Sequence, residues 1–307
     1  MKISQIEGLK DMGIDKEYIN LLQILEETNP CEQSYITEKD LFVVLYKQKI
    51  NLLNFKNLFP LWINATIVGL PISLSEKGYF GEEKQVEENI KAIKGLTIVL
   101  NADMPFSVYG RTLSTFRFYN HFHNFQDYLD SLRSPYRRRI LLALKKRIKL
   151  DIRKTEFSKD HYKLYKSVLN RSDYPLESMS LDFFKRWNAE IYEFLNLQGK
   201  VIGFVQLKQI KQTLYFVFCG FEKEDIKVYD IYLNMLIWII EIAIKKGVTE
   251  IDFGQTSEET KLKLGCKERE KYLFINHSNP IIDKIIKFFL PKFSYKGYKV
   301  DHRVFKR

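Results

Sequence analysis

Residues 229–246 limit the fold of this chain more than any other segment, because they are apolar at almost every position. A helix that is apolar on all sides has to be buried in a core. Gly247 follows directly, and glycine readily adopts the left-handed conformation that ends many helices. Asn234 and Glu241 interrupt the apolar run, so it falls short of the about 18 apolar residues that a membrane span requires. We therefore predict a core helix and no transmembrane segment.

Strands and helices follow one another in a definite order around this core helix. Residues 201–207 and 214–219 are rich in β-branched and aromatic residues and are joined by a polar turn, which predicts a β-hairpin. The full predicted order is a strand at 151–155, helices at 159–169 and 181–195, the hairpin, the core helix, a strand at 250–253, a helix at 259–264, a strand at 272–275 and a helix from 280. The first half combines short strands, among them 65–68 and 96–100, with an exposed helix at 82–93. This mixture predicts an α+β protein.

A basic helix divides the chain. Between residues 131 and 154, ten Lys or Arg residues stand against a single Asp. Apolar residues recur there at helical spacing, which predicts an amphipathic helix over about 134–148 with one basic face. We place the junction of two domains at the start of this segment, so that the N-terminal domain spans 1–130 and the C-terminal domain spans 131–307.

The overall charge points to an anionic partner. The chain has 49 Lys and Arg residues against 38 Asp and Glu residues, a net charge of +11. Such an excess favours contact with a polyanion or an anionic substrate. The three cysteines show no paired metal spacing and the N-terminus lacks an apolar signal stretch, so we expect a cytoplasmic protein with reduced thiols. His121 and His123 would share one strand face, but no third ligand has suitable spacing, so we predict no metal site.

Two motifs in the second half carry a resemblance to a known family. FQDYLDSL at 125–132 with YRRR at 136–139, and IDFGQTS at 251–257 with KLKLG at 261–265, resemble segments of the FemAB-like acyltransferases, which are tandem GNAT (N-acetyltransferase) domains. The resemblance implies two GNAT-like domains with mixed twisted sheets and a cleft between them. It further implies an N-acyltransferase that moves an acyl or aminoacyl group onto an amine by direct attack. Fem proteins use aminoacyl-tRNA to extend peptidoglycan peptides.

The segment that would hold the donor departs from the usual GNAT pattern. The pyrophosphate loop, R/Q-x-x-G-x-G/A, should fall at residues 222–229, which contain no glycine. Backbone N–H groups approach a phosphate best where glycine opens the way. The donor is acyl-CoA or aminoacyl-tRNA, and the missing glycines favour one that is not held in the usual CoA manner. We expect no tightly bound cofactor and a small-molecule or peptide amine as acceptor. The competing interpretation is a non-catalytic protein that binds RNA or a cell-wall precursor.

The resemblance also suggests roles for single residues. Lys261 matches the family lysine and would offer positive charge to the acyl carbonyl or to a donor phosphate, although Lys263 lies close enough to be the true counterpart. Asp252 would take a proton from the incoming amine, or else cap the glycine turn that follows it. Gln255 and Ser257 would hydrogen-bond the substrate, or, for Ser257, cap the next helix.

Two basic segments have a functional and a structural interpretation. Arg137 and Arg138 carry guanidinium forks that match phosphate, such as that of a tRNA, yet consecutive arginines point in different directions and a charged helix face is usually just solvated. Residues 281–293 form a predicted basic amphipathic helix. Packing against its own domain is the simpler account, and a peripheral contact with an anionic membrane is the alternative.

Overall fold

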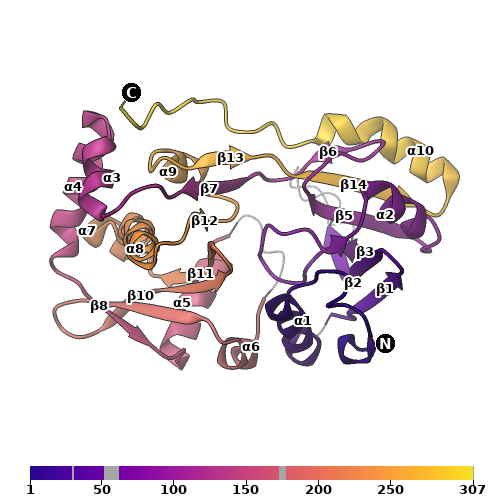
Figure 1. Cartoon of the computed structure of the whole chain (residues 1–307), viewed down its shortest axis with the longest axis horizontal. Helices are drawn as coiled ribbons and strands as arrows, with labels where there is room; N and C mark the ends of the chain where they lie inside the picture. Colours follow the sequence, from indigo (N-terminus) through magenta and orange to yellow (C-terminus); the bar gives the residue numbers. More distant parts are fainter. Residues whose placement is uncertain (30, 52–61, 173–177, 307) are drawn as a thin grey trace. The chain divides into compact units, whose positions relative to one another are not determined.

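The chain folds into an α+β structure with two mixed β-sheets (Figure 1), which confirms the predicted fold class. A computed structural model describes residues 1–29, 31–51, 62–172 and 178–306. Two compact units divide the chain. Unit 1 is Met1–Ser114 with Glu270–Gly297, and unit 2 is Thr115–Arg269 with Tyr298–Arg307.

Unit 1 is built on a seven-stranded sheet in the order β1-β2-β3-β5-β14-β6, with β4 paired to β2. Its buried core packs Val43, Val99 and Phe274 together on one side of this sheet. The strands are β1 (Ser34–Glu38), β2 (Leu41–Asn51), β3 (Trp62–Val68), β4 (Tyr79–Phe80), β5 (Leu96–Ala102), β6 (Gly110–Arg111) and β14 (Tyr272–His277). The helices are η1 (Ile3–Gln5), α1 (Lys16–Thr28), α2 (Glu83–Ile90), α10 (Pro280–Phe289) and η2 (Leu290–Phe293).

Unit 2 is built on a second seven-stranded sheet in the order β13-β7-β12-β11-β10-β9-β8. The strands are β7 (Thr115–Tyr119), β8 (Asp151–Thr155), β9 (Glu190–Leu195), β10 (Val201–Ile210), β11 (Thr213–Phe221), β12 (Glu250–Asp252) and β13 (Lys267–Arg269). The helices are α3 (Phe125–Ser131), α4 (Ser134–Arg147), α5 (Lys159–Asn170), α6 (Leu181–Arg186), α7 (Lys223–Tyr229), α8 (Ile231–Lys246) and α9 (Glu258–Leu262).

Each sheet contains one parallel pair, at the same place in the strand order of its unit. β3 pairs in parallel with β5, and α2 lies between them in the chain; β11 pairs in parallel with β12, and α7 and α8 lie between them. The pairing of β11 with β12 covers only Thr213–Tyr215 against Glu250–Asp252, although β11 continues to Phe221. The two strands therefore part toward the C-terminal end of β11.

The predicted core helix is α8. Most of its side chains are buried in the main hydrophobic cluster of unit 2, and Met235, Ile239 and Ile240 are fully so. Gly247 ends the helix with φ of 66°, in the left-handed region. A second left-handed residue, Asp230 with φ of 47°, separates α8 from the short helix α7, so the predicted helix over 229–246 begins two residues later than expected.

One segment that the sequence predicts to be a single helix forms a short helix and then a strand. The sequence predicted a helix over 181–195, but α6 ends at Arg186 and Glu190–Leu195 forms strand β9. Half of the side chains of this strand, Ile191, Tyr192 and Phe194, are β-branched or aromatic, and such residues favour the pleated, packed surface of a sheet. Backbone pairing with β10, for example of Tyr192 with Val205, outweighs the helical spacing of its apolar residues.

The division of the chain differs from the predicted domains 1–130 and 131–307. Strand β7 pairs with β12 and β13, so the chain enters unit 2 at Thr115. Strand β14 pairs with β5 and β6, so Glu270–Gly297 returns to unit 1. The predicted boundary assumed that each domain is one continuous segment, whereas strand pairing joins segments that lie far apart in sequence.

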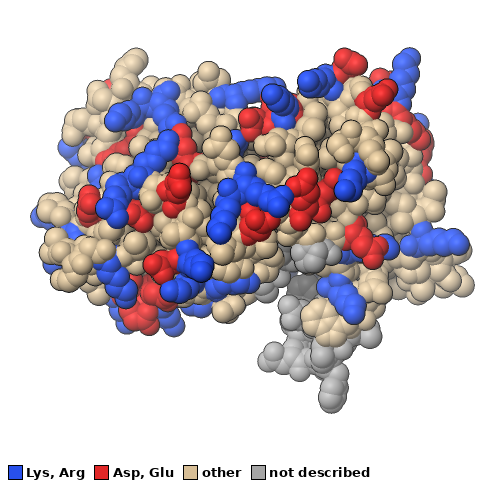
Figure 2. Space-filling model, turned by 90° about the horizontal axis from the view of Figure 1, so that it is seen from below, with Lys and Arg blue, Asp and Glu red and all other residues tan. Residues whose placement is uncertain are grey.

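Basic and acidic side chains are interspersed on the surface. On the face that Figure 2 shows, Lys and Arg lie among Asp and Glu rather than in one continuous basic field. On this face, the positive charge is therefore divided among local groups of Lys and Arg side chains. Within the described part of the chain, every helix is too short or too polar to cross a lipid bilayer.

Candidate functional site

The loop that follows β12 brings together the residues that the FemAB-like motif singled out. The backbone of Gly254 is held from two sides: its N–H donates to Oδ1 of Asp252 (2.7 Å), and its carbonyl oxygen accepts from Nζ of Lys261 (3.1 Å). Nζ of Lys261 also donates to the carbonyl oxygen of Gln255 (2.6 Å). The two predicted catalytic side chains thus fix the conformation of one loop.

Asp252 belongs to a buried polar network. Its side chain is only 2% exposed, and Oδ1 also accepts from Oγ1 of Thr115 on β7 (2.8 Å). Oδ2 lies 3.4 Å from Nη2 of Arg117, whose Nη1 pairs with Glu250 (2.6 Å). The carboxylate caps the glycine turn, which is the structural alternative that the sequence left open for this residue.

Lys261 is buried, with 1% of its surface exposed. Burial lowers the pKa of its ammonium to about 8, against the opposing influence of nearby Cys266 and Asp252. Nζ also lies 5.7 Å from the centre of the Phe116 ring. Lys263 is more exposed and pairs with Glu259 on the preceding turn, so of the two candidate lysines only Lys261 reaches the loop.

The loop has an unusual backbone. Thr256 and Ser257 follow each other with φ of 63° and 52°, and non-glycine residues seldom adopt this left-handed region. Ser257 stands at the N-cap position of α9, as predicted, but its side chain makes no capping hydrogen bond. Ser257 lies near Tyr232 of α8 and acts to lower the pKa of its hydroxyl, against the larger effect of burial. Lys261 therefore holds the backbone directly before these left-handed turns, through the carbonyl groups of Gly254 and Gln255.

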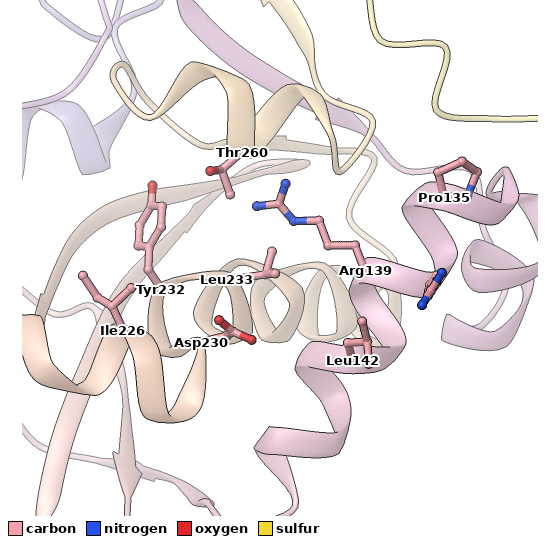
Figure 3. Close-up of a pocket in the computed structure, with 9 residues that line it drawn as sticks. Pro135, Arg139, Leu142, Ile226, Asp230, Tyr232, Leu233 and Thr260 are labelled. Carbon is pink, nitrogen blue, oxygen red and sulfur yellow. The ribbon is translucent and has the colours of Figure 1, made fainter.

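A pocket of about 440 Å³ lies beside this loop, entirely within unit 2 (Figure 3). Helices α4, α7, α8 and α9 and the turn at Asp230 supply its walls. The lining residues are Pro135, Arg138, Arg139, Leu142, Ile226, Asp230, Tyr232, Leu233 and Thr260. Figure 3 shows the Arg139 side chain extending from α4 toward Thr260, with the Tyr232 hydroxyl also directed toward that side.

The arginines of α4 divide between the pocket and the surface. Arg138 and Arg139 are exposed side chains at the pocket wall, and neither forms an ion pair within the described residues. Arg137 lies elsewhere and pairs with Asp130 of α3 (2.9 Å). The acidic group of the pocket, Asp230, is already paired with Lys146 (2.9 Å). Arg139 helps to lower the pKa of the Glu259 carboxyl but forms no ion pair with it. Arg138 and Arg139 thus place guanidinium groups at the wall of a cavity of ligand size, which suits a phosphate.

The strand-to-helix connection where a GNAT enzyme would hold pyrophosphate carries acidic residues. β11 ends at Phe221 and α7 begins at Lys223, at the place that the sequence predicted. Glu222 is the N-cap, and Glu224 and Asp225 occupy the first turn. Three carboxyl groups here oppose an anionic ligand, because like charges repel and the side chains occupy the positive end of the helix.

Sequence reasoning missed part of the pocket. Tyr232 and Thr260 were not singled out, and burial raises the pKa of the Tyr232 hydroxyl, which stays protonated at neutral pH. The available signal was Asp230, because an acidic residue directly before an apolar run indicates the start of a new helix. No three His, Cys, Asp or Glu side chains gather into a metal-binding group anywhere in the described ranges.

Comparison with known proteins gives relatives by structure only, since no family model and no curated sequence matches. The C-terminal domain (DUF2156) of a putative lysylphosphatidylglycerol synthetase from Agrobacterium fabrum aligns over 95% of this chain and 98% of its own, with a TM-score of 0.55 and 12% identity. L-PGS from Bacillus licheniformis aligns over 90% and 97%, with a TM-score of 0.52 and 13% identity. The chain shares their fold. FemX aligns over 84% and 90%, with a TM-score of 0.49 and 12% identity.

The shared fold confirms the two-domain, GNAT-like architecture that the sequence motifs implied. The Agrobacterium fabrum and Bacillus licheniformis structures align with nearly the whole of this chain, so the likeness includes unit 1 as well as unit 2. The motifs gave little support for a GNAT-like fold in the first half of the chain. That fold now rests on the likeness to these structures and on a parallel strand pair in unit 1 that corresponds to the one in unit 2.

Proposed function

We propose that this protein transfers an aminoacyl group from aminoacyl-tRNA to an amine acceptor, and that unit 2 holds the phosphate-bearing end of the donor. The observation that carries the proposal is the pair of unpaired arginines, Arg138 and Arg139, on the wall of a pocket beside the loop after β12. The synthetase that shares the fold is named for a lysyl group joined to phosphatidylglycerol, which supports an aminoacyl group as the cargo.

The charge distribution favours tRNA over CoA as the donor. Acyl-CoA would place its pyrophosphate at the start of α7, where Glu222, Glu224 and Asp225 repel it. The basic face of α4 instead offers guanidinium groups along a helix, which suits a chain of phosphates. Charged tRNA is a cytoplasmic molecule, so the proposal requires the protein to work in the cytoplasm.

The reaction consists of one displacement at the acyl carbonyl. The amine nitrogen attacks the carbonyl carbon, the ester C–O bond breaks, and the terminal hydroxyl of the tRNA leaves with the proton that the amine loses. We assign Lys261 and Asp252 a positioning role, because their polar atoms are engaged with the backbone of Gly254 and Gln255. The loop that they hold, with Gln255 and Ser257, would face the acyl group.

The Tyr232 hydroxyl is the group best placed to act on the reacting carbonyl. It lines the pocket and stays protonated at neutral pH, so it can donate a hydrogen bond to oxygen as negative charge develops there. Ser257 lies near this hydroxyl and acts on its pKa in the direction opposite to burial. These assignments give each motif residue a task without requiring a free ammonium or carboxylate at the pocket.

Binding of donors to the full chain tests the proposal. The double variant Arg138→Gln/Arg139→Gln should weaken binding of aminoacyl-tRNA by about tenfold to a hundredfold, because two charge-assisted hydrogen bonds to phosphate are lost. Arg186→Gln, in an exposed arginine of α6 that pairs with Asp182, is the matched control and should bind normally. The proposal is wrong if acetyl-CoA binds more tightly than aminoacyl-tRNA and the double variant binds both as the wild type does.

One observation favours the second candidate, a non-catalytic protein that binds RNA in the same pocket. Both residues that the family motif suggests as catalytic are buried and bonded to backbone groups. Incubation with radiolabelled aminoacyl-tRNA and a panel of small amines and peptides separates the two functions. A labelled amide product supports the transferase, whereas tight tRNA binding with no product beyond spontaneous hydrolysis supports the binding protein.

A further inference from the structure

Helix α10 of unit 1 presents its apolar side to solvent. Ile281, Ile285 and Phe288 are 71%, 53% and 67% exposed, and Ile282 and Phe289 are 42% exposed each. Large hydrophobic side chains that gather in one exposed patch mark a surface that contacts something else, whereas isolated ones do not. Five of them on a ten-residue helix form such a patch, which we call the α10 patch.

The opposite side of the helix accounts for its attachment to unit 1. Ile286 packs against the cluster that contains Tyr46 and Ile67, and Leu290, just after the helix, is buried. The ion pair between Asp283 and Lys287 (2.7 Å) is largely shielded on this side. The α10 patch is therefore not needed to hold the helix in place, and packing against its own domain does not account for it.

Lysines border the patch. Residues 280–299 contain five lysines and one acidic residue, Asp283, which is already paired with Lys287. Lys284 is exposed, and Nζ of Lys292 lies 4.8 Å and 5.4 Å from the ring centres of Phe288 and Phe289. An exposed apolar face bordered by positive charge matches a helix that lies in the headgroup region of an anionic membrane.

We propose that the α10 patch is a membrane-docking surface that inserts into bilayers containing anionic lipids. A second copy of the chain is disfavoured as the occupant, because two such patches would bring two sets of lysines together. The inference goes beyond the proposed transferase activity and does not depend on it, since it concerns only the attachment of unit 1 to a lipid surface.

Sedimentation with lipid vesicles tests the inference on the full chain. The wild type should bind vesicles of phosphatidylcholine mixed with phosphatidylglycerol, and bind phosphatidylcholine alone about tenfold less well or worse. Ile285→Glu/Phe288→Glu should reduce binding to the anionic vesicles by about tenfold or more, because it places negative charge on the helix face that would insert into the bilayer. Leu197→Glu, at a 76% exposed leucine in a turn of unit 2, is the matched control and should bind as the wild type does.

Two further measurements separate lipid binding by the α10 patch from misfolding and from self-association. Lys284→Glu/Lys292→Glu should weaken binding to anionic vesicles while circular dichroism and thermal unfolding match the wild type. Analytical ultracentrifugation without lipid should show a wild-type monomer. The inference is overturned if the wild type binds neither kind of vesicle, if Ile285→Glu/Phe288→Glu binds normally, or if the wild type self-associates and this variant is monomeric. Aminoacyl transfer to a soluble amine, assayed without lipid, reports separately on the proposed function.

Discussion

At the scale of single residues, the sequence located the right loop but not the way in which its side chains act. The motif placed Asp252, Lys261, Gln255 and Ser257 near one another, and the structure brings all four to the turn around Gly254. Whether a lysine on a five-residue helix points outward or back to the preceding loop depends on the left-handed turns at Thr256 and Ser257. Sequence patterns do not encode such turns when glycine is absent.

Replacing Lys261 separates a positioning role from simple surface charge. Lys261→Met keeps the apolar stem but leaves the carbonyl groups of Gly254 and Gln255 without a donor, so the free energy of unfolding should fall by about 1–3 kcal/mol. If the proposed transferase holds, kcat should fall about a hundredfold with little change in KM for the donor, because the loop loses its reactive geometry. Lys263→Met is the control, and unchanged turnover in Lys261→Met would refute the positioning role.

The pKa of Lys261 gives the same variant a pH signature. The folded-state pKa of about 8 lies below the ordinary value of 10.5, so between these values the unfolded chain binds more protons than the folded one. Stability from this group therefore rises with pH over that window, by up to about 3 kcal/mol. The difference in unfolding free energy between wild type and Lys261→Met, measured in urea from about pH 7 to about pH 10, should grow with pH. A constant difference would show that Lys261 titrates normally.

At the scale of secondary structure, long elements with a clear period could be predicted, whereas short elements whose residues fit both a helix and a strand could not. The core helix α8, the hairpin β10–β11 and the basic helix α4 all lie where periodicity placed them. Helix α8 and the hairpin bury the side chains that their patterns predict, whereas α4 buries Ile140 and Ala143 and leaves Leu141 and Ile148 exposed. Strand β9 was assigned to a helix, because its apolar residues fit both periods and only pairing with β10 decides between them. Tyr232 could not be recognised as a pocket residue because the walls of the pocket come from four helices, and their arrangement in space cannot be read from periodicity.

Two glycines set how closely helices approach the unit 2 sheet. A Cβ on Gly220 would lie 2.6 Å from backbone atoms of Leu164 and Tyr165 in α5, whereas one on Gly203 would meet chiefly the flexible end of Met235 in α8. Gly220→Ala should therefore destabilise the fold by about 3 kcal/mol or more, and Gly203→Ala by about 1 kcal/mol, in chemical unfolding experiments. The reverse order would show that α8, rather than α5, is the helix with no room to move.

At the scale of the whole molecule, the sequence predicted two similar domains but not which segments compose them. The alternation of strands and helices indicates fold class locally, and the likeness to the synthetase structures bears it out. Strand β14, however, carries no sign in its sequence that it pairs with β5, more than a hundred residues earlier, rather than with a neighbouring strand. Partner choice among similar apolar strands depends on the assembled sheet, so the domain boundary could not be predicted from periodicity.

Phe274 of β14 tests this division of the chain directly. Its ring is fully buried in the core of unit 1 and stacks on Phe106 at 5.1 Å, although it lies in the segment predicted to belong to the second domain. Phe274→Ala should cost about 3–5 kcal/mol and should reduce hydrogen-exchange protection in β2 and β5. Protection in β10 and β11 should persist, while the control Phe194→Ala, in the core of unit 2, should show the opposite pattern. If Phe274→Ala instead exposes β10 and β11 and spares β5, then β14 belongs with unit 2 and the continuous boundary at residue 130 describes the molecule.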